Sequence, residues 1–250
     1  MEVITEQQLS PQAPLAPCQI CNEAIAANTD TMCSFEHVQP MYCSNCLKEY
    51  VERKIADGFR GFCPRIKCPG NHDKNDACNL DFNKWSAVVG AESVKQYNQF
   101  AESILSILCG SCHKQSTCLV KVDPSKSIAT QDELAVESKA ALAEDLELYA
   151  KGRKTANDFY EKLLSLIPEL NSGEDVAAWK IIETVLNLIH DPERRASLQL
   201  RHFKSRPRMQ TACCKNNHCW NCKTKSHDGV NCEAHNASLD HSVVPCPQCG

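Results

Sequence analysis

The sequence predicts a series of small metal-stabilised modules interrupted by a mainly α-helical segment. Three observations support this fold class. The 250 residues include 18 cysteines and 9 histidines, and several cysteines form pairs separated by two residues. These cysteines occupy two stretches, residues 18–118 and 213–249, whereas residues 119–212 contain none. That cysteine-free stretch has apolar residues at helical spacing, so we expect a conventional core mainly there.

We expect the cysteines to bind zinc rather than to form disulfides. The chain begins with acidic and polar residues instead of a basic and then apolar leader, and no apolar run is long enough to span a bilayer. This pattern predicts a cytoplasmic protein without a membrane segment, with the nucleus as the alternative compartment. In a reducing compartment, closely spaced thiols usually bind metal. Redox catalysis is disfavoured because such a site needs a single Cys-x2-Cys pair, and several recur here.

The charge balance argues against a nucleic-acid partner. The chain has 27 basic and 31 acidic residues and a formal net charge of −4. Binding to a phosphate backbone requires a basic face. The most basic stretch, residues 194–208, is equally well explained as a solvated helix end.

The first module is expected in residues 18–80, after a tail of 17 residues that contains three prolines and three glutamines and is predicted to be disordered. It contains two Cys-x2-Cys pairs, Cys18 with Cys21 and Cys43 with Cys46. Between the pairs are Cys33 and His37. Three candidates for the last ligand pair follow downstream: Cys63, Cys68 and Cys78. A Cys-x2-Cys turn places two thiolates on one zinc ion.

This ligand order resembles a RING domain, in which the first and third pairs share one ion and the second and fourth pairs share another. The resemblance implies one site at Cys18, Cys21, Cys43 and Cys46, and a second at Cys33, His37 and two later cysteines. A PHD finger is disfavoured because its histidine is the fifth ligand. Residues 61–69 resemble the end of the first RING in RING-between-RING ubiquitin ligases, which favours Cys68 and Cys78 over Cys63. Spacing alone leaves that choice open.

Helices are expected between the two cysteine-rich stretches. Residues 81–118 should contain a linker helix over 84–108 and the first part of a second module. Within residues 119–212, a capping-box pattern at Thr130 and Glu133 predicts a helix start. Apolar residues then recur at helical spacing to Ile167, again from 175 to 189, and over a short final helix at 193–203. We expect these helices to form a hairpin that packs on itself.

The second module is expected to end in residues 213–232. The spacing of Cys219, Cys222, His227 and Cys232 puts all four within reach of one zinc ion. With Cys214, this string resembles the second half of an in-between-RING domain. The other site of that domain would combine Cys109 and Cys112 with Cys213 and Cys214, which makes residues 119–212 an insertion within the domain. Adjacent cysteines share an ion only with backbone strain, so Cys118 is the alternative to Cys213, and His113 and His218 are weaker candidates.

Residues 233–250 are expected to be a linker and the opening of an incomplete second RING, marked by Cys246 and Cys249. In the family, the catalytic cysteine follows this pair by several residues, and no residue here matches it. We therefore assign no catalytic residue.

The resemblance covers residues 18–118 and 213–250 and implies a RING-between-RING ubiquitin ligase that binds about four zinc ions. Its partners would be a ubiquitin-conjugating enzyme, ubiquitin and an unknown protein substrate. Ile20 matches the apolar position by which such RINGs contact the conjugating enzyme, although a small core is another use for this side chain. The alternative function is a non-catalytic zinc-module scaffold that docks proteins through its helical segment.

Overall fold

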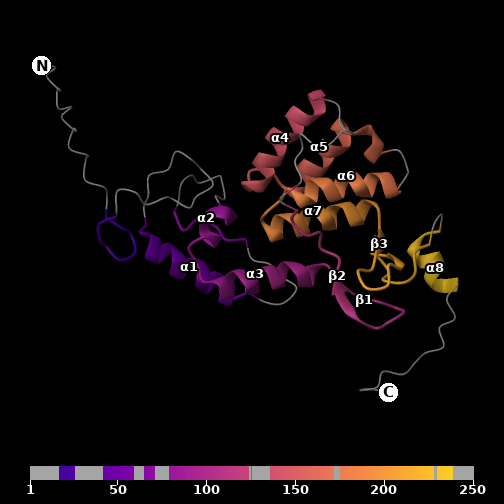
Figure 1. The fold of residues 1–250 in the computed structure, drawn as a ribbon, viewed down its shortest axis with the longest axis horizontal. Helices are drawn as coiled ribbons and strands as arrows, with labels where there is room; N and C mark the ends of the chain where they lie inside the picture. The colour runs from indigo at the N-terminus through magenta and orange to yellow at the C-terminus, as the bar shows by residue number, and fades with distance from the viewer. Residues whose placement is uncertain are drawn as a thin grey trace, which may run out of the picture.

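A computed structural model describes residues 17–25, 42–58, 65–70, 79–123, 125, 136–171, 175–227 and 230–238. The described chain is mainly helical, with two short β-ribbons near the C-terminal module (Figure 1). In chain order its elements are α1 (Ser44–Ala56), α2 (Phe82–Ser86), α3 (Ala91–Ile104), β1 (Ser106–Leu108), β2 (Gln115–Thr117), α4 (Val136–Ala150), α5 (Ala156–Leu166), the short 3-10 helix η2 (Pro168–Leu170), α6 (Asp175–Asn187), α7 (Pro192–Ser205), β3 (Arg208–Gln210), β4 (Asn217–Cys219) and α8 (Cys232–Ser238). The predicted fold class, small cysteine-rich modules with a mainly helical segment, is confirmed.

Helices α1 and α3 pack together and form much of the first core. The buried residues of α1 are Leu47, Val51 and Ile55, which recur every four positions and so form one apolar stripe. On α3 the buried side chains include Tyr97, whose ring lies edge-on to Trp85 of α2 at 5.1 Å between centroids. This packing anchors α2 and α3 against the first module.

The single helix expected over residues 84–108 is wrong. Helix α2 ends at Ser86, α3 begins after Gly90, and residues 106–108 form strand β1. Gly90 has an extended backbone, and its N–H donates to the carboxylate of Glu52 on α1 at 3.0 Å. The apolar period continues through the break because both helices face the same core, so periodicity did not reveal the interruption.

Helices α4 to α7 build a second core. Tyr149 of α4 stacks on Phe159 of α5 with ring centroids 4.8 Å apart, and both are fully buried. The predicted stop at Ile167 and the predicted final helix are confirmed, because α5 ends at Leu166 and α7 covers 192–205. Asp191 caps α7 by accepting a hydrogen bond from the Glu193 N–H at 2.9 Å. The predicted helix start at Thr130 and Glu133 lies outside the described residues.

Helix α7 lies between the two cores. Its Ala196 and Phe203 belong to the first core, whereas Leu198 belongs to the second. The helix contacts α3 as well as α5 and α6, so the hairpin is not self-contained. Arg194 and Arg195 are only 3% and 8% exposed. The expectation of a solvated basic helix end at this point is therefore wrong.

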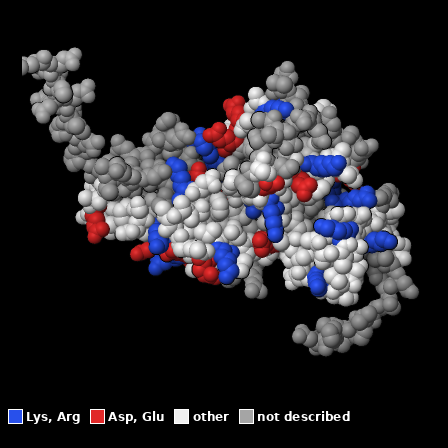
Figure 2. Space-filling view, in the orientation of Figure 1, with Lys and Arg blue, Asp and Glu red and all other residues white. Residues whose placement is uncertain are grey.

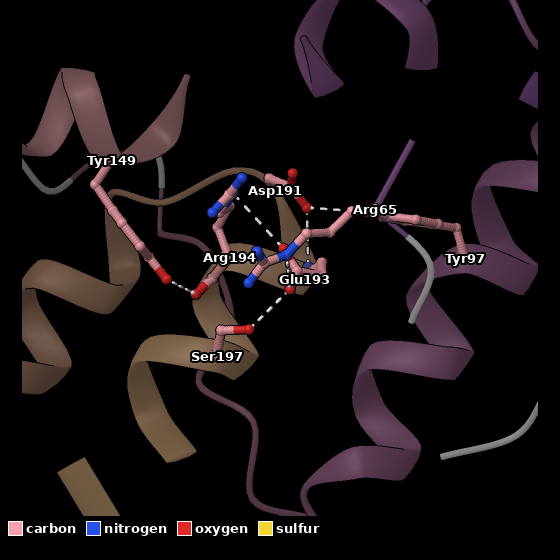
Figure 3. A network of polar contacts seen from close by, with 7 residues as sticks. All are labelled: Arg65, Tyr97, Tyr149, Asp191, Glu193, Arg194 and Ser197. Carbon is pink, nitrogen blue, oxygen red and sulfur yellow. Dashed lines mark hydrogen bonds and ion pairs between the residues drawn. The ribbon is translucent and has the colours of Figure 1, made fainter. Parts of the chain in front are cut away.

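A polar network holds the start of α7 against the N-terminal half of the chain (Figure 3). The Glu193 carboxylate accepts hydrogen bonds from Arg65 Nε at 3.0 Å and from Ser197 Oγ at 2.8 Å. The Tyr97 hydroxyl donates to Asp191 at 3.3 Å, and Tyr149 donates to the Arg194 carbonyl at 2.6 Å. Hydrogen bonds to charged groups stabilise more than neutral ones. The network therefore links residues more than 120 positions apart, as in the Arg65–Glu193 pair with its separation of 128.

Candidate metal centres

The structure brings twelve side chains into three groups of four, each with its ligand atoms within 4.8 Å of one another. We name them the first cluster (Cys18, Cys21, Cys43, Cys46), the split cluster (Cys109, Cys112, Cys213, Cys214) and the third cluster (Cys219, Cys222, His227, Cys232). One sulfur–sulfur distance in each is 3.7, 3.4 and 3.6 Å, respectively. Tetrahedral zinc with Zn–S bonds of about 2.3 Å separates its sulfurs by about 3.8 Å. All three groups therefore have dimensions that fit a four-coordinate metal ion.

The same backbone turn positions a pair of cysteines in each of the three clusters. In the Cys18–Cys21 turn, the Cys18 N–H donates to the Glu23 carbonyl, and the Asn22 N–H donates back to the Cys18 carbonyl, both at 2.8 Å. Asn22 has a φ of +61°, in the left-handed region. The turns that begin at Cys109 and Cys219 have the same two backbone hydrogen bonds. In each of them, the residue four positions after the first cysteine is likewise left-handed. Left-handed residues close such turns tightly, which points both sulfurs to one side.

A fourth copy of this turn begins at a threonine. The Thr211 N–H donates to the Asn216 carbonyl at 2.9 Å, and the Lys215 N–H donates to the Thr211 carbonyl at 3.1 Å. Lys215 is left-handed, with a φ of +56°. By this pattern, Thr211 occupies the place of the first cysteine, and Cys214 the place of the second. Cys213 then supplies the remaining sulfur of the split cluster, which explains why two adjacent cysteines meet there.

The β-ribbons carry the two halves of the split cluster. Strands β1 and β2 pair antiparallel with Ile107 opposite Ser116, and they flank the Cys109–Cys112 turn. Strands β3 and β4 pair with Met209 opposite His218, and they flank the Thr211 turn. Two ribbons of similar build therefore face each other across one cluster, although their sequences lie about 100 residues apart.

In the third cluster, a hydrogen bond sets the histidine's tautomer. His227 Nδ1 lies 2.7 Å from the Val230 carbonyl, which can only accept, so Nδ1 carries the proton. Nε2 is left as the free lone pair, and it lies 3.4 Å from Cys222 Sγ. A metal-binding histidine commonly donates its other ring nitrogen to a carbonyl in this way.

Each cluster also contains one thiol that ionises readily. Backbone N–H groups of Cys112 and Ser111 lower the pKa of the Cys109 thiol to about 5. Burial opposes ionisation of Cys18, but backbone N–H groups, chiefly that of Cys21, outweigh it and lower its pKa to about 6. For Cys222 burial likewise opposes ionisation, and Thr224 contributes most to lowering the pKa to about 6. The thiolate is the metal-binding form of cysteine.

Two further thiols show the effect of crowding on their pKa. Hydrogen bonding to Cys112 and the other sulfurs of the split cluster raises the pKa of Cys214 to about 12. The neighbouring Cys219 sulfur is the main cause that raises the pKa of Cys232 to about 11. Adjacent thiolates repel one another, and a bound divalent cation offsets that repulsion. The chemistry of these donor sets therefore fits a metal ion.

Two predicted alternatives for the split cluster receive no support from the geometry. Cys118 points elsewhere, because its thiol donates to the Leu105 carbonyl at 3.0 Å, and burial raises its pKa to about 12. His218 is buried, but it is not among the four grouped ligands. Cys213 is the sulfur that joins Cys109, Cys112 and Cys214.

Several predicted ligands cannot be placed. Cys68 is described and partly buried, but it is not among the three grouped ligand sets. The other candidates for the second site of the first module, and the last predicted pair, lie outside the described residues: Cys33, His37, Cys63, Cys78, Cys246 and Cys249. The sequence also contains no signal for Thr211, which carries neither a thiol nor an imidazole and is identified by its backbone hydrogen bonds.

Ile20 lies at the tip of the Cys18–Cys21 turn with 55% of its surface exposed. The first core includes Cys18 and Ile25 near it but not Ile20. The use of Ile20 as a small core residue, which the sequence left open, is therefore wrong. An exposed aliphatic side chain beside a metal cluster is instead available to a partner.

None of the described helices combines the length and the hydrophobicity that crossing a membrane requires.

Comparison with known proteins gives a consistent picture. No protein-family model matches the chain, and neither does any solved structure. The E3 ubiquitin-protein ligase RNF144A of Homo sapiens is 25% identical over 214 residues, which cover 84% of this chain and 68% of that protein. RNF144A of Mus musculus is 26% identical over 214 residues, which again cover 84% of this chain and 68% of that protein. The probable E3 ubiquitin-protein ligase RNF144A of Xenopus tropicalis is 29% identical over 109 residues, 42% of this chain and 35% of that protein. This similarity and the three ligand clusters agree with the resemblance to RING-between-RING ubiquitin ligases that the sequence predicts.

Proposed function

We propose that this chain acts in ubiquitin transfer by recruiting a ubiquitin-conjugating enzyme through its first module. The observation that carries the proposal is the exposed Ile20 at the tip of the first cluster. Burying such an exposed apolar residue against a partner makes the free energy of binding more favourable. Ubiquitin and an unidentified protein substrate would be the further partners.

We propose zinc as the ion in all three clusters. The donors are four sulfurs in two clusters and three sulfurs with one imidazole in the other. Four-coordinate sites built from cysteine and histidine are the usual structural zinc sites, and hard cations such as calcium prefer oxygen ligands. These residues would hold zinc as a structural ion that fixes the turns, with no open position for a substrate.

We propose that the in-between-RING domain is split along the sequence. Residues 81–118 would contain its linker and first ligand pair, residues 213–232 its remaining ligands, and residues 119–212 a helical insertion. Supporting this, the split cluster combines ligands from both sides of the insertion, with Cys112 and Cys213 separated by 101 positions. A reducing compartment, the cytoplasm or the nucleus, is proposed because closely spaced thiols bind metal there, and the described cysteines form three four-ligand groups.

A pull-down with a panel of ubiquitin-conjugating enzymes tests the recruitment. We expect the zinc-loaded chain to retain at least one enzyme, and Ile20→Ala to weaken that binding by about tenfold or more. Leu108→Ala is the matched control, because Leu108 is an equally exposed aliphatic residue, at 58%, on strand β1. If no enzyme of the panel is retained, recruitment is refuted and the scaffold function becomes the better explanation.

A further inference from the structure

A groove runs between the β-ribbons and helices α6 and α7, with a volume of about 420 Å³. One wall is the segment 117–121 together with strand β3. The other wall is a stripe of α6 at helical spacing, Asp175, Val176, Trp179 and Glu183, joined by the C-terminal turn of α7. Ligand sites in proteins usually have volumes of about 300–1,000 Å³, so this groove is large enough to bind a ligand.

The floor of the groove is aromatic and uncharged. Trp179 stacks on Phe203 with ring centroids 5.5 Å apart and an angle of 13° between their planes. His202 lies beside them, and its Nδ1 is 3.1 Å from the Tyr160 hydroxyl. Burial lowers the pKa of His202 to about 4, so its ring is neutral at neutral pH. Leu119 and Met209 add aliphatic surface. The floor therefore favours apolar side chains.

The rim of the groove is basic on balance. Lys121, Arg206, Arg208 and Lys215 line it, against the two acidic residues Asp175 and Glu183. Arg206 and Asp175 neutralise each other, because Arg206 Nη1 pairs with the Asp175 carboxylate at 2.7 Å. On the face shown in Figure 2, basic side chains also outnumber acidic ones toward the end of the molecule that carries the β-ribbons. An acidic partner complements this rim.

We propose that this groove binds an extended peptide segment in which aliphatic residues are flanked by acidic ones. The aliphatic side chains contact Trp179, which Phe203 supports from beneath by stacking, and the flanking carboxylates pair with Lys121 and Lys215 at the rim. Val176, which is 67% exposed at the lip on α6, covers one side of the bound segment. The proposal does not depend on ubiquitin transfer, because the groove is separate from Ile20 and from the metal ligands.

The probe is a fluorescein-labelled hexapeptide with two leucines flanked on each side by two glutamates. Fluorescence anisotropy is measured with the full, zinc-loaded 250-residue chain. We expect saturable binding with a Kd on the order of 10–100 µM that weakens as salt is added. Lys121→Glu, at an exposed rim position, should weaken binding about fivefold to tenfold. Val176→Glu should do the same without disturbing the core, because this side chain is mostly exposed.

Three controls make the test decisive. Lys225→Glu changes the net charge equally but does not line the groove, so it should alter the Kd by about twofold at most. A hexapeptide with serines in place of the leucines, and one with lysines in place of the glutamates, should each bind at least about tenfold more weakly. Equal binding of the serine peptide, an equal effect of Lys225→Glu, or no saturable binding of the probe would each overturn the proposal. Circular dichroism of each variant verifies that it is folded.

Discussion

Thr211 shows how one residue redirects metal ligation. It begins a turn whose backbone bonds match those of the cysteine turns, but its side chain presents an oxygen 3.9 Å from Cys109 Sγ. A sulfur at that position would lie near the spacing of tetrahedral ligands. The neighbouring Cys213 supplies the sulfur instead.

This interpretation predicts a rescue. Cys213→Ser should remove the zinc of the split cluster, because three sulfurs hold the ion poorly. Adding Thr211→Cys to that variant should restore it, because the new thiol sits where the turn normally places its first ligand. The measurement is zinc content per chain by elemental analysis after dialysis. Failure of the double variant to recover an ion, while remaining folded, would contradict the equivalence of the Thr211 turn.

Asp191 should make stability depend on pH. Burial raises the pKa of this carboxyl from 3.8 to about 6, and the nearby Glu193 charge adds to the effect. Arg194 opposes it, and Arg195 also feels the Asp191 charge. Because the folded pKa exceeds the unfolded one, the protonated form stabilises the fold below pH 4, and that contribution is lost as the pH rises toward and through 6.

Asp191→Asn removes this dependence while keeping an oxygen that can accept from Tyr97 and from the Glu193 N–H. Relative to the variant, the unmodified chain should lose about 1 kcal/mol of unfolding free energy between pH 5 and pH 7. Urea unfolding of both proteins at the two pH values measures the difference, and proton effects on shared metal ligands cancel. A constant difference across this range would contradict the raised pKa.

At the scale of elements, α7 depends on Glu193. The side chains of Glu193 and Arg194 are only 7% and 4% exposed, and their closest N–O approach is 3.6 Å. Breaking a buried charge pair leaves the partner charge uncompensated, at a cost of about 3–5 kcal/mol. Glu193→Ala should therefore lower the free energy of unfolding by about 3 kcal/mol, as measured by chemical denaturation.

A surface pair offers the matched comparison. Arg201 pairs with Glu161 at 2.8 Å, but the Glu161 side chain is 55% exposed. Glu161→Ala should cost about 1 kcal/mol at most, because solvent screens exposed pairs. Comparable losses in both variants would show that burial does not set the strength of the Glu193 contacts.

The sequence predicts local features of these elements and misses the distant ones. Cysteine spacing predicts the third cluster and the Cys-x2-Cys turns, because these features are short and local. The joining of distant pairs in the first cluster and the split cluster was implied by the family resemblance, not by spacing. Asp191 and Pro192 likewise mark the start of α7, because capping depends on neighbouring residues. The break at Gly90 and the burial of Arg194 were missed because each involves a residue far along the chain. Gly90 donates to Glu52, and Arg194 lies over the ring of Tyr149 at 5.7 Å.

For the whole molecule, the two cores differ in their dependence on metal. The first core contains Cys18 and packs against other cluster sulfurs, whereas the second core is formed by residues of α4 to α7 and neighbouring segments without any cysteine. Metal that binds the folded state alone contributes its binding free energy to stability. The N-terminal module and the ribbons should therefore depend more on zinc than α4 to α6 do.

Chelation tests this division. We expect about four zinc ions per chain, three in the described clusters and one in the first module's second site, where Cys68 is a candidate. Removing them with a chelator should abolish the tertiary signal of Trp85 and Trp220 but leave more than about half of the helical circular dichroism. A chain that holds no metal when reduced, or that keeps its full fold after chelation, would contradict the zinc assignment.

The span of the split cluster gives its ion a different thermodynamic character from that of its neighbour. Cys112 and Cys213 are 101 positions apart, whereas Cys219 and Cys232 are separated by only 13. Cross-linking a free chain over about 100 residues costs about 4–5 kcal/mol of configurational entropy. When α4 to α7 fold, they already bring Cys112 and Cys213 close together, so the ion does not have to supply this entropy on binding. The stability of these helices and the affinity of the split cluster for its ion are therefore reciprocally linked. Any ligand or mutation that stabilises α4 to α7 would thus raise zinc occupancy of the split cluster without contacting it, whereas zinc occupancy of the third cluster would not change.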